Sequence, residues 1–231
     1  MADNPLLPQD RLRELYALMS RVHAMERRKV KVAREALLAA TLIHLSAGDL
    51  VCAAPGDSTL QSLAPKSPGG AAAHHLPASL RIPLCAGAAR GLQTAGTDRV
   101  AVAFASAGTS ETGWEDALRW AHRDELPLLL VVADTGRNVA GRQSAESLLL
   151  WPKLTKVAGK LHLPHFPVDG EDAVAVFRVV QETAARARAH GGPSVIWAML
   201  NAERPAPGQQ PLRRLQEYMT ARGISLNSLS R

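Results

Sequence analysis

The sequence is poor in cysteine, in aromatic residues and in long apolar runs. Its two cysteines, Cys52 and Cys85, lie far apart in the 231-residue chain, and there is no second pair. Neither a disulfide framework nor a zinc site is indicated, and we expect two buried, inert thiols. No stretch approaches the ~20 uninterrupted apolar residues that a membrane-spanning helix needs. The chain starts with a proline and acids instead of a signal peptide, so we expect a cytoplasmic protein with no membrane partner.

Clusters of one charge are equally scarce. The formal net charge of +6 favours anionic partners in principle. The only tight basic cluster is Arg27-Arg28-Lys29, with Lys31 and Arg34 just beyond it. No aromatic residue that could stack on a base lies close by, so we interpret this cluster as a solvated helix face and expect no nucleic-acid partner. No G-x-G-x-x-G run follows a predicted strand, so the glycine turn of a nicotinamide-binding site is missing.

What the sequence does contain is alanine, leucine and valine, with hydrophobic residues making up 46%. This composition favours a globular protein in which helices pack closely on a sheet. We expect one α/β domain over residues 1–231, with a doubly wound, mainly parallel sheet and helices on both faces. Its parts are a helical lead (1–52), an irregular loop (53–83), a βα core (84–200) and a loop with a C-terminal helix (201–231).

Alternating apolar runs and helical periods support this organisation. Three apolar runs of strand length, VAVAFA, LPLLLVVAD and SVIWAML, are separated by helical segments, which is the pattern of parallel βαβ units. Val168-Asp169-Gly170 predicts a further strand end and turn. The predicted helices are 9–45 in two stretches, a small-residue helix at CAGAARGLQTA, and then 113–123, 144–160, 171–190 and 212–222.

Several segments resemble one family. DRVAVAFASAGTSETGWEDALRWAHRDELPLLLVVAD and PVDGEDAVAVFRVVQETAARARAHGGPSVIWAML resemble the alpha subunit of the thiamine-diphosphate-dependent 2-oxo-acid dehydrogenases. LRELYALMSRVHAMERR, SAGDLV, IPLCAGAARGL and QPLRRLQEYMTARGI are similar to further segments of that subunit, in the same order along nearly the whole chain. The resemblance implies the thiamine-diphosphate-binding fold. It also implies assembly as a homodimer or as a heterotetramer with a beta-like subunit.

The resemblance also shows which positions should hold the cofactor. In the family, a Gly-Asp-Gly turn and a later Asn bind the divalent cation on the pyrophosphate. Read without gaps, the turn falls on Ala105-Ser106-Ala107 and the Asn on Thr135. Neutral hydroxyls thus stand where magnesium prefers carboxylate and amide oxygens. Asp134 or Glu111 could replace the missing aspartate only by turning toward the site.

The pyrophosphate side departs from the family as well. The family's Tyr-Arg-Asp-His run reads Pro55, Gly56, Asp57 and Ser58 here, so only Asp57 persists. The bidentate donors of the family's Arg are lost at Gly56. The family's His-x-His loop falls after SVIWAML, where the sequence soon reaches Gln210-Pro211 with no His in between.

The remaining candidates are histidines and one helix start. We interpret His74-His75 as a surface pair, and His162 and His165 as lacking an acidic or cysteine partner for a metal. Ser110-Glu111 is interpreted as a helix cap, because no base stands beside it.

Three hypotheses follow from these observations. The preferred one is an alpha-like subunit that has lost thiamine diphosphate and magnesium and acts as a non-catalytic or regulatory partner of a beta-like chain. The first alternative is an active 2-oxo-acid decarboxylating subunit that binds both through altered ligands near Ser106, Thr135, Asp134, Asp57 and Glu111. The second alternative is a protein that binds another anionic small molecule in the vacant crevice.

Overall fold

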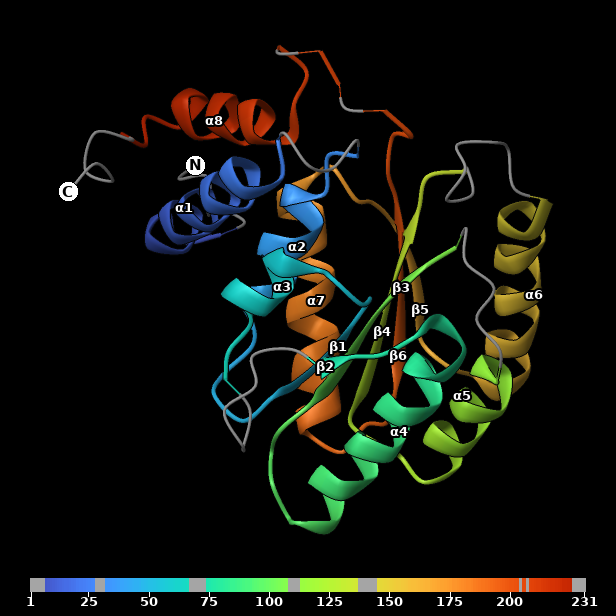
Figure 1. Cartoon of the computed structure of the whole chain (residues 1–231). Coiled ribbons are helices and arrows are strands. Elements are labelled where there is room, and N and C mark those ends of the chain that lie inside the picture. The colour runs from blue at the N-terminus through green and yellow to red at the C-terminus, as the bar shows by residue number, and fades with distance from the viewer. Residues whose placement is uncertain are drawn as a thin grey trace.

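Figure 1 shows a computed structural model of the chain, in which a central sheet separates two layers of helices. The structure describes residues 7–27, 32–66, 74–107, 113–136, 145–203, 205–206 and 208–225, without the side chains of 74, 78, 79 and 145–151.

The sheet has six strands, and every pair of neighbours is parallel, in the order β2-β1-β3-β4-β6-β5. The strands are β1 (Leu50–Ala53), β2 (His74–His75), β3 (Ala101–Ser106), β4 (Leu128–Asp134), β5 (His165–Asp169) and β6 (Ser194–Met199). Because all strands run the same way, their carboxyl ends meet at one edge of the sheet, where doubly wound folds place their ligands.

Helices cover both faces of this sheet (Figure 1). They are α1 (Gln9–Glu26), α2 (Glu35–Leu42), α3 (Ser58–Leu63), α4 (Ala78–Thr94), α5 (Trp114–Arg123), α6 (Ala145–Leu161), α7 (Ala173–Arg188) and α8 (Pro211–Ala221). The buried side chains form two clusters, one joining the sheet to α1, α2, α3, α7 and α8, the other joining it to α4, α5 and α6. The predicted α/β fold with a parallel sheet and helices on both faces is therefore confirmed.

The central strands are buried on both sides, which explains their continuous apolar sequences. In β3, Val102 and Phe104 belong to the first cluster, whereas Ala101, Ala103 and Ala105 belong to the second. The period of two sends alternate side chains to opposite faces, and both faces need apolar residues when both are covered. The alanines on the second face let α4 approach the sheet closely.

The segment between β1 and α4 differs from the expectation. The predicted irregular loop over 53–83 is wrong in part, because α3, β2 and the start of α4 fall within it. The predicted helical lead (1–52) likewise ends too late, since β1 begins at Leu50. Of these elements, β1, β2 and α3 have two to six residues, too few to show a hydrophobic period. A side-chain cap starts α3, where the Asp57 carboxylate accepts a hydrogen bond from Leu60 N.

The remaining predicted elements agree with the structure to within a few residues at their ends. The helical stretch 9–45 resolves into α1 and α2, and the turn predicted at Val168-Asp169-Gly170 follows β5 directly. None of the helices in the described ranges is long and apolar enough to cross a membrane.

Candidate functional site

A cavity of about 220 Å³ opens at the carboxyl ends of β1, β3 and β4, where the first helical layer approaches the sheet. Most of its wall is apolar. The lining residues are Val32, Arg34, Leu37, Leu38, Ala54, Asp57, Arg81, Phe104, Ala105, Ser106, Ala133, Thr135 and Leu200. Its position is the one at which parallel α/β sheets bind their ligands.

Ser106 and Thr135 reach this cavity from neighbouring strands. Ser106 is the last residue of β3 and pairs with Ala133 of β4, and Thr135 follows β4 two residues later. The two residues that the resemblance aligned with the family's cation ligands are thus brought together, and each supplies a neutral hydroxyl.

Asp134 differs from Ala133 and Thr135, which line the cavity, because its carboxylate binds groups of neighbouring strands and turns. One carboxylate oxygen accepts a hydrogen bond from the indole N–H of Trp197 at 3.1 Å, and the other accepts one from Gly136 N at 2.8 Å. Trp197 is 2% exposed. The carboxylate therefore anchors the end of β4 to β6 and closes the turn after β4, although sequence reasoning placed it as a possible metal ligand.

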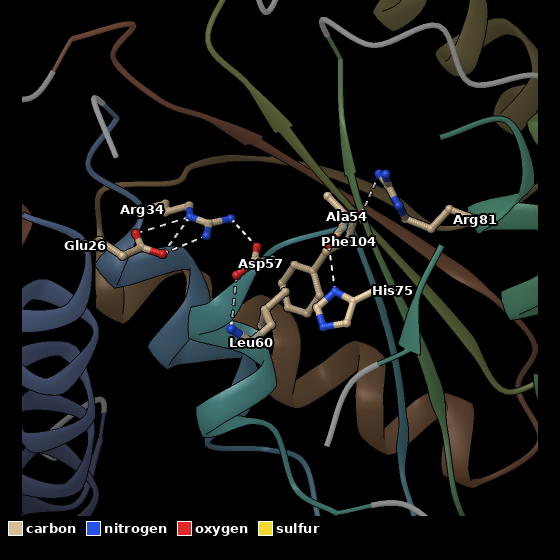
Figure 2. A network of polar contacts seen from close by, with 8 residues as sticks. All are labelled: Glu26, Arg34, Ala54, Asp57, Leu60, His75, Arg81 and Phe104. Atoms are coloured by element: carbon tan, nitrogen blue, oxygen red, sulfur yellow. Dashed lines mark hydrogen bonds and ion pairs between the residues drawn. The ribbon is translucent and has the colours of Figure 1, made fainter. Parts of the chain in front are cut away.

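Arg34 is the central charged group of the cavity wall (Figure 2). Its Nε and Nη2 donate to the Glu26 carboxylate at 2.7–3.2 Å, and its Nη1 donates to Asp57 at 2.8 Å. Although burial opposes the charge, the hydrogen bonds to Asp57 and Glu26 raise the pKa of Arg34 above its ordinary value. Such charge-assisted, partly bidentate pairs are the strong ones. The guanidinium is consequently committed to two carboxylates of this chain.

Asp57 has two tasks in this arrangement. It pairs with Arg34 and also caps α3 through Leu60 N, and its side chain is 7% exposed. Asp57 therefore lines the cavity and also fixes the start of α3 against Arg34. It is the one residue of the predicted Tyr-Arg-Asp-His segment that matches the family's pattern.

The opposite wall is fixed by Arg81 and His75. Arg81 is 4% exposed, and its guanidinium donates to the carbonyl oxygens of Phe104 at 3.1 Å and Leu76 at 3.3 Å. His75 lies 2.8 Å from the carbonyl oxygen of Ala54 through Nδ1, and 2.7 Å from Gln61 Oε1 through Nε2. Figure 2 shows His75 beside Ala54 and Arg81 beside Phe104, around the ends of β1, β2 and β3.

The charges around the cavity cancel. Arg34 and Arg81 contribute two positive charges, and Asp57 together with the adjoining Glu26 contributes two negative ones. A pyrophosphate needs an excess of donors and positive charge, and a cation bridging it needs carboxylate or amide oxygens. This donor set does not fit a magnesium pyrophosphate.

No metal site is indicated elsewhere in the part of the chain that the structure describes. Within it, no three His, Cys, Asp or Glu side chains lie close enough together to hold a metal ion. His162 and His165 are among the residues covered by this statement, whereas Glu111 and Ser110 lie outside the described residues.

The end of β6 supplies one more wall of the cavity through Leu200. The turn at Gly170 brings its own N–H within 2.8 Å of the Met199 carbonyl oxygen. A Cβ at this glycine would lie 2.8 Å from Leu200 Cδ2, so only glycine fits without a shift. The buried Glu171 carboxylate accepts hydrogen bonds from the backbone and side-chain amides of Asn201, which fixes the chain leaving β6.

Sequence reasoning missed Arg34 and Arg81 as cavity residues, and Glu26 as the partner that holds Arg34. Arg34 was interpreted as part of a solvated basic face, and this is wrong, because its side chain is 24% exposed and bound to two acids. No local pattern signals these contacts. The partners of Arg34 lie 8 and 23 residues away.

Comparison with known proteins adds three findings. The model of the family described as "Dehydrogenase E1 component" matches residues 46–200. The 3-methyl-2-oxobutanoate dehydrogenase subunit alpha of Mycobacterium tuberculosis is 34% identical over 114 residues, 49% of this chain and 30% of that protein. The pyruvate dehydrogenase E1 component subunit alpha of Staphylococcus epidermidis is 26% identical over 159 residues, 60% of this chain and 42% of that protein.

A solved structure agrees with these sequence matches at the level of the fold. The benzoylformate decarboxylase from Polynucleobacter necessarius is similar with a TM-score of 0.52 and 13% identity, covering 74% of this chain and 33% of that one. The chain spans less than half the length of each of these relatives.

Proposed function

This chain belongs to the dehydrogenase E1 component family, and on that premise we propose that it is an alpha-like subunit without cofactor. It keeps the family fold, binds neither thiamine diphosphate nor magnesium, and acts as a non-catalytic or regulatory partner of a beta-like chain.

The observation that carries this proposal is the donor set at the carboxyl ends of β3 and β4. Ser106 and Thr135 occupy the two cation positions with neutral hydroxyls, and the nearby Asp134 carboxylate is held by Trp197 and Gly136 N. Turning Asp134 toward the cavity would break its hydrogen bonds with the buried indole N–H of Trp197 and with Gly136 N, at a cost of about 1–3 kcal/mol. A compensating ligand at Asp134 is therefore disfavoured.

The cavity charges support the same proposal. Arg34 gives three of its five N–H groups to Glu26 and Asp57, whose two carboxylates outweigh its single positive charge, and Glu26 is 1% exposed. Removing one partner from a buried ion pair leaves an uncompensated charge, which costs about 3–5 kcal/mol. The ion pairs of this chain thus compete directly with an anionic cofactor.

One face of α4 is a candidate docking surface for the proposed partner. Leu80 and Leu84 are 49% and 48% exposed, and a Cβ added at Gly87 or Gly91 would meet nothing within 4 Å. Leu80, Leu84, Gly87 and Gly91 are spaced by four, three and four residues, so they share one face of the helix. An open apolar face with small residues suits close packing against another chain, either a second copy in a homodimer or a beta-like subunit in a heterotetramer.

Calorimetry with thiamine diphosphate and magnesium tests the proposal. The chain is titrated alone and with a beta-like chain of the same family, and we expect no magnesium-dependent heat up to about 1 mM ligand, the weak end of specific binding. The S106D/T135N variant, which restores a carboxylate and an amide, is the matched comparison. The catalytic alternative gains if the unaltered chain shows magnesium-dependent binding.

Asp134→Asn then decides which residue holds the metal. If binding by the unaltered chain disappeared in D134N while its fold persisted by circular dichroism, Asp134 would be the replacement ligand and our proposal would fail. If the unaltered chain binds nothing, D134N should only lower stability, through its contacts with Trp197 and Gly136.

A second candidate function is the binding of another small anion in the crevice. It is favoured by one observation, the apolar cavity of about 220 Å³ with the 4% exposed Arg81 in its wall. Cavities that are mostly apolar with a few placed polar groups are typical of small-molecule sites. Native mass spectrometry of the purified chain would reveal such a ligand as a discrete added mass that R81Q loses.

A further inference from the structure

The two cysteines of the chain lie opposite each other across one layer contact. Cys52 is on β1, where it pairs in register with Ala103 of β3, and Cys85 is on α4, which packs against β1 and β3. Both belong to the second buried cluster, at 2% and 0% exposure. They are the only cysteines in the sequence.

The two thiols are in hydrogen-bond contact and are chemically unequal. The hydrogen bond from Cys85, together with the charge of Arg81, lowers the pKa of the Cys52 thiol against the opposing effect of burial. Burial raises the pKa of the Cys85 thiol. Cys52 is thus the better thiolate and Cys85 the proton donor, which is the asymmetry that a nucleophilic and a resolving cysteine need.

The pair is also close along the chain to residues that line the cavity. Ala54 follows Cys52 by two residues and Arg81 precedes Cys85 by one helical turn, and both line the cavity. Asp57 lies between them in the sequence as well. A covalent bond between the two sulfurs would close a loop that carries three cavity residues, Ala54, Asp57 and Arg81.

We propose that Cys52 and Cys85 form a reversible intramolecular disulfide that fastens β1 to α4 beside the cavity. Both side chains lie in the same buried cluster between the sheet and α4, which is the arrangement that an S–S bond of about 2 Å requires. A bond between β1 and α4 also needs no rearrangement of the sheet, because the two elements already touch. The inference is independent of the proposed function.

The chemistry balances with hydrogen peroxide as the oxidant. The Cys52 thiolate attacks one peroxide oxygen, the O–O bond breaks, and a sulfenic acid forms while hydroxide leaves and is protonated to water. The Cys85 sulfur then attacks the Cys52 sulfur, the S–O bond breaks, and a second water leaves. Two thiols and one peroxide thus give one disulfide and two waters, and a dithiol reductant reverses the change by exchange. Peroxide is small enough to suit a buried pair.

Mass spectrometry of the unaltered chain before and after peroxide treatment tests the proposal. We expect the intact mass to fall by two hydrogen atoms, and a digest to contain one peptide pair joined at Cys52 and Cys85. The oxidised chain should melt about 5–10 °C higher than the reduced chain, because the bond closes a loop of roughly 30 residues. Dithiothreitol should restore both the mass and the melting temperature.

Single variants distinguish the roles of the two thiols. In the C85A variant, peroxide should oxidise Cys52 to sulfinic acid, because no resolving thiol remains. In the C52A variant, Cys85 should stay largely reduced. Circular dichroism checks that both variants fold. Peroxide treatment that leaves two free thiols in the unaltered chain, or yields only sulfinic acid or disulfides between chains, would overturn the proposal without recourse to any variant.

Discussion

The two ends of the sheet hold charged residues in opposite circumstances. At the amino end, Asp49 precedes β1, is 0% exposed and accepts hydrogen bonds from Arg188 at 2.6 Å, Ser46 N at 2.8 Å and Val100 N at 3.0 Å. At the carboxyl end, the cavity is lined by the neutral Ser106 and Thr135, where the resemblance predicts the family's cation ligands. The acid of the family-like SAGDLV segment thus persists where it binds the chain to itself.

The difference between the two ends lies in what their acidic residues bind. Asp49 ties the starts of β1 and β3 to α7, so its loss would leave several buried groups without partners. The carboxylates near the carboxyl end, Asp57 and Asp134, also bind groups of this chain. At both ends of the sheet, these carboxylates are therefore engaged in holding the fold together, which agrees with the proposal that this chain does not bind the cofactor.

The largest effect is expected from Asp49→Ala. The substitution leaves the Arg188 guanidinium, 24% exposed on its side chain, without its carboxylate, and strips two backbone N–H groups of their acceptor. We expect a loss of about 3–5 kcal/mol in the free energy of unfolding. Urea denaturation measures it.

The double variant D49A/R188M provides the matched control for this prediction. Removing the orphaned charge should recover part of the loss, because a buried pair replaced by apolar groups is far less costly than a pair broken on one side. A loss below about 1 kcal/mol in D49A would remove the contrast between the two ends of the sheet.

A medium effect is expected from pH, and it also belongs to the amino end. His44 follows α2, its carbonyl oxygen accepts from Arg188, and its ring lies 4.2 Å from the Phe177 ring. Burial first, and the charge of Arg11 next, lower the pKa of His44 to about 4. The unfolded chain, with an ordinary histidine pKa, binds the proton more readily between pH ~6.5 and ~4. The stability contributed by neutral His44 is therefore present above this window and lost as the pH falls through it.

The size of this pH effect can be isolated with His44→Gln. Between pH ~7 and ~4.5, the free energy of unfolding of the unaltered chain should fall by about 1–2 kcal/mol more than that of H44Q. Carboxylates elsewhere contribute equally to both chains, so the difference belongs to His44. Parallel pH curves for the two chains would show that the ring is protonated in the folded state without penalty.

The sequence predicted the regular parts of this molecule better than its short ones. The apolar runs of β3, β4 and β6 and the periods of α5 and α7 are long enough to be recognised locally. By contrast, α3 depends on the cap at Asp57, and β2 depends on pairing with β1. Neither dependence is visible in a local pattern, so both elements were assigned to a loop.

The same distinction applies to the candidate site. Ser106, Thr135 and Asp57 were predicted from the order of segments, and all three line the cavity. Arg34 and Arg81 could not be predicted, because their placement depends on Glu26 and on the Phe104 carbonyl oxygen, respectively, which only the folded chain brings close. Whether any of these residues binds a cofactor stays a prediction.

The smallest effect is expected from Ser106→Ala and Thr135→Ala at the carboxyl end. Both residues are neutral and border a cavity, so alanine leaves no buried charge behind. Each substitution should change the free energy of unfolding by less than about 1 kcal/mol, against the several kcal/mol expected for D49A. Urea denaturation of the variants in parallel with D49A makes the comparison direct. A loss of about 2 kcal/mol or more at either hydroxyl would mean that these residues hold the fold together as Asp49 does. The hydroxyls at these two positions would then be explained by a structural role. The contrast between the two ends of the sheet would no longer distinguish residues that stabilise the fold from residues at the predicted ligand positions.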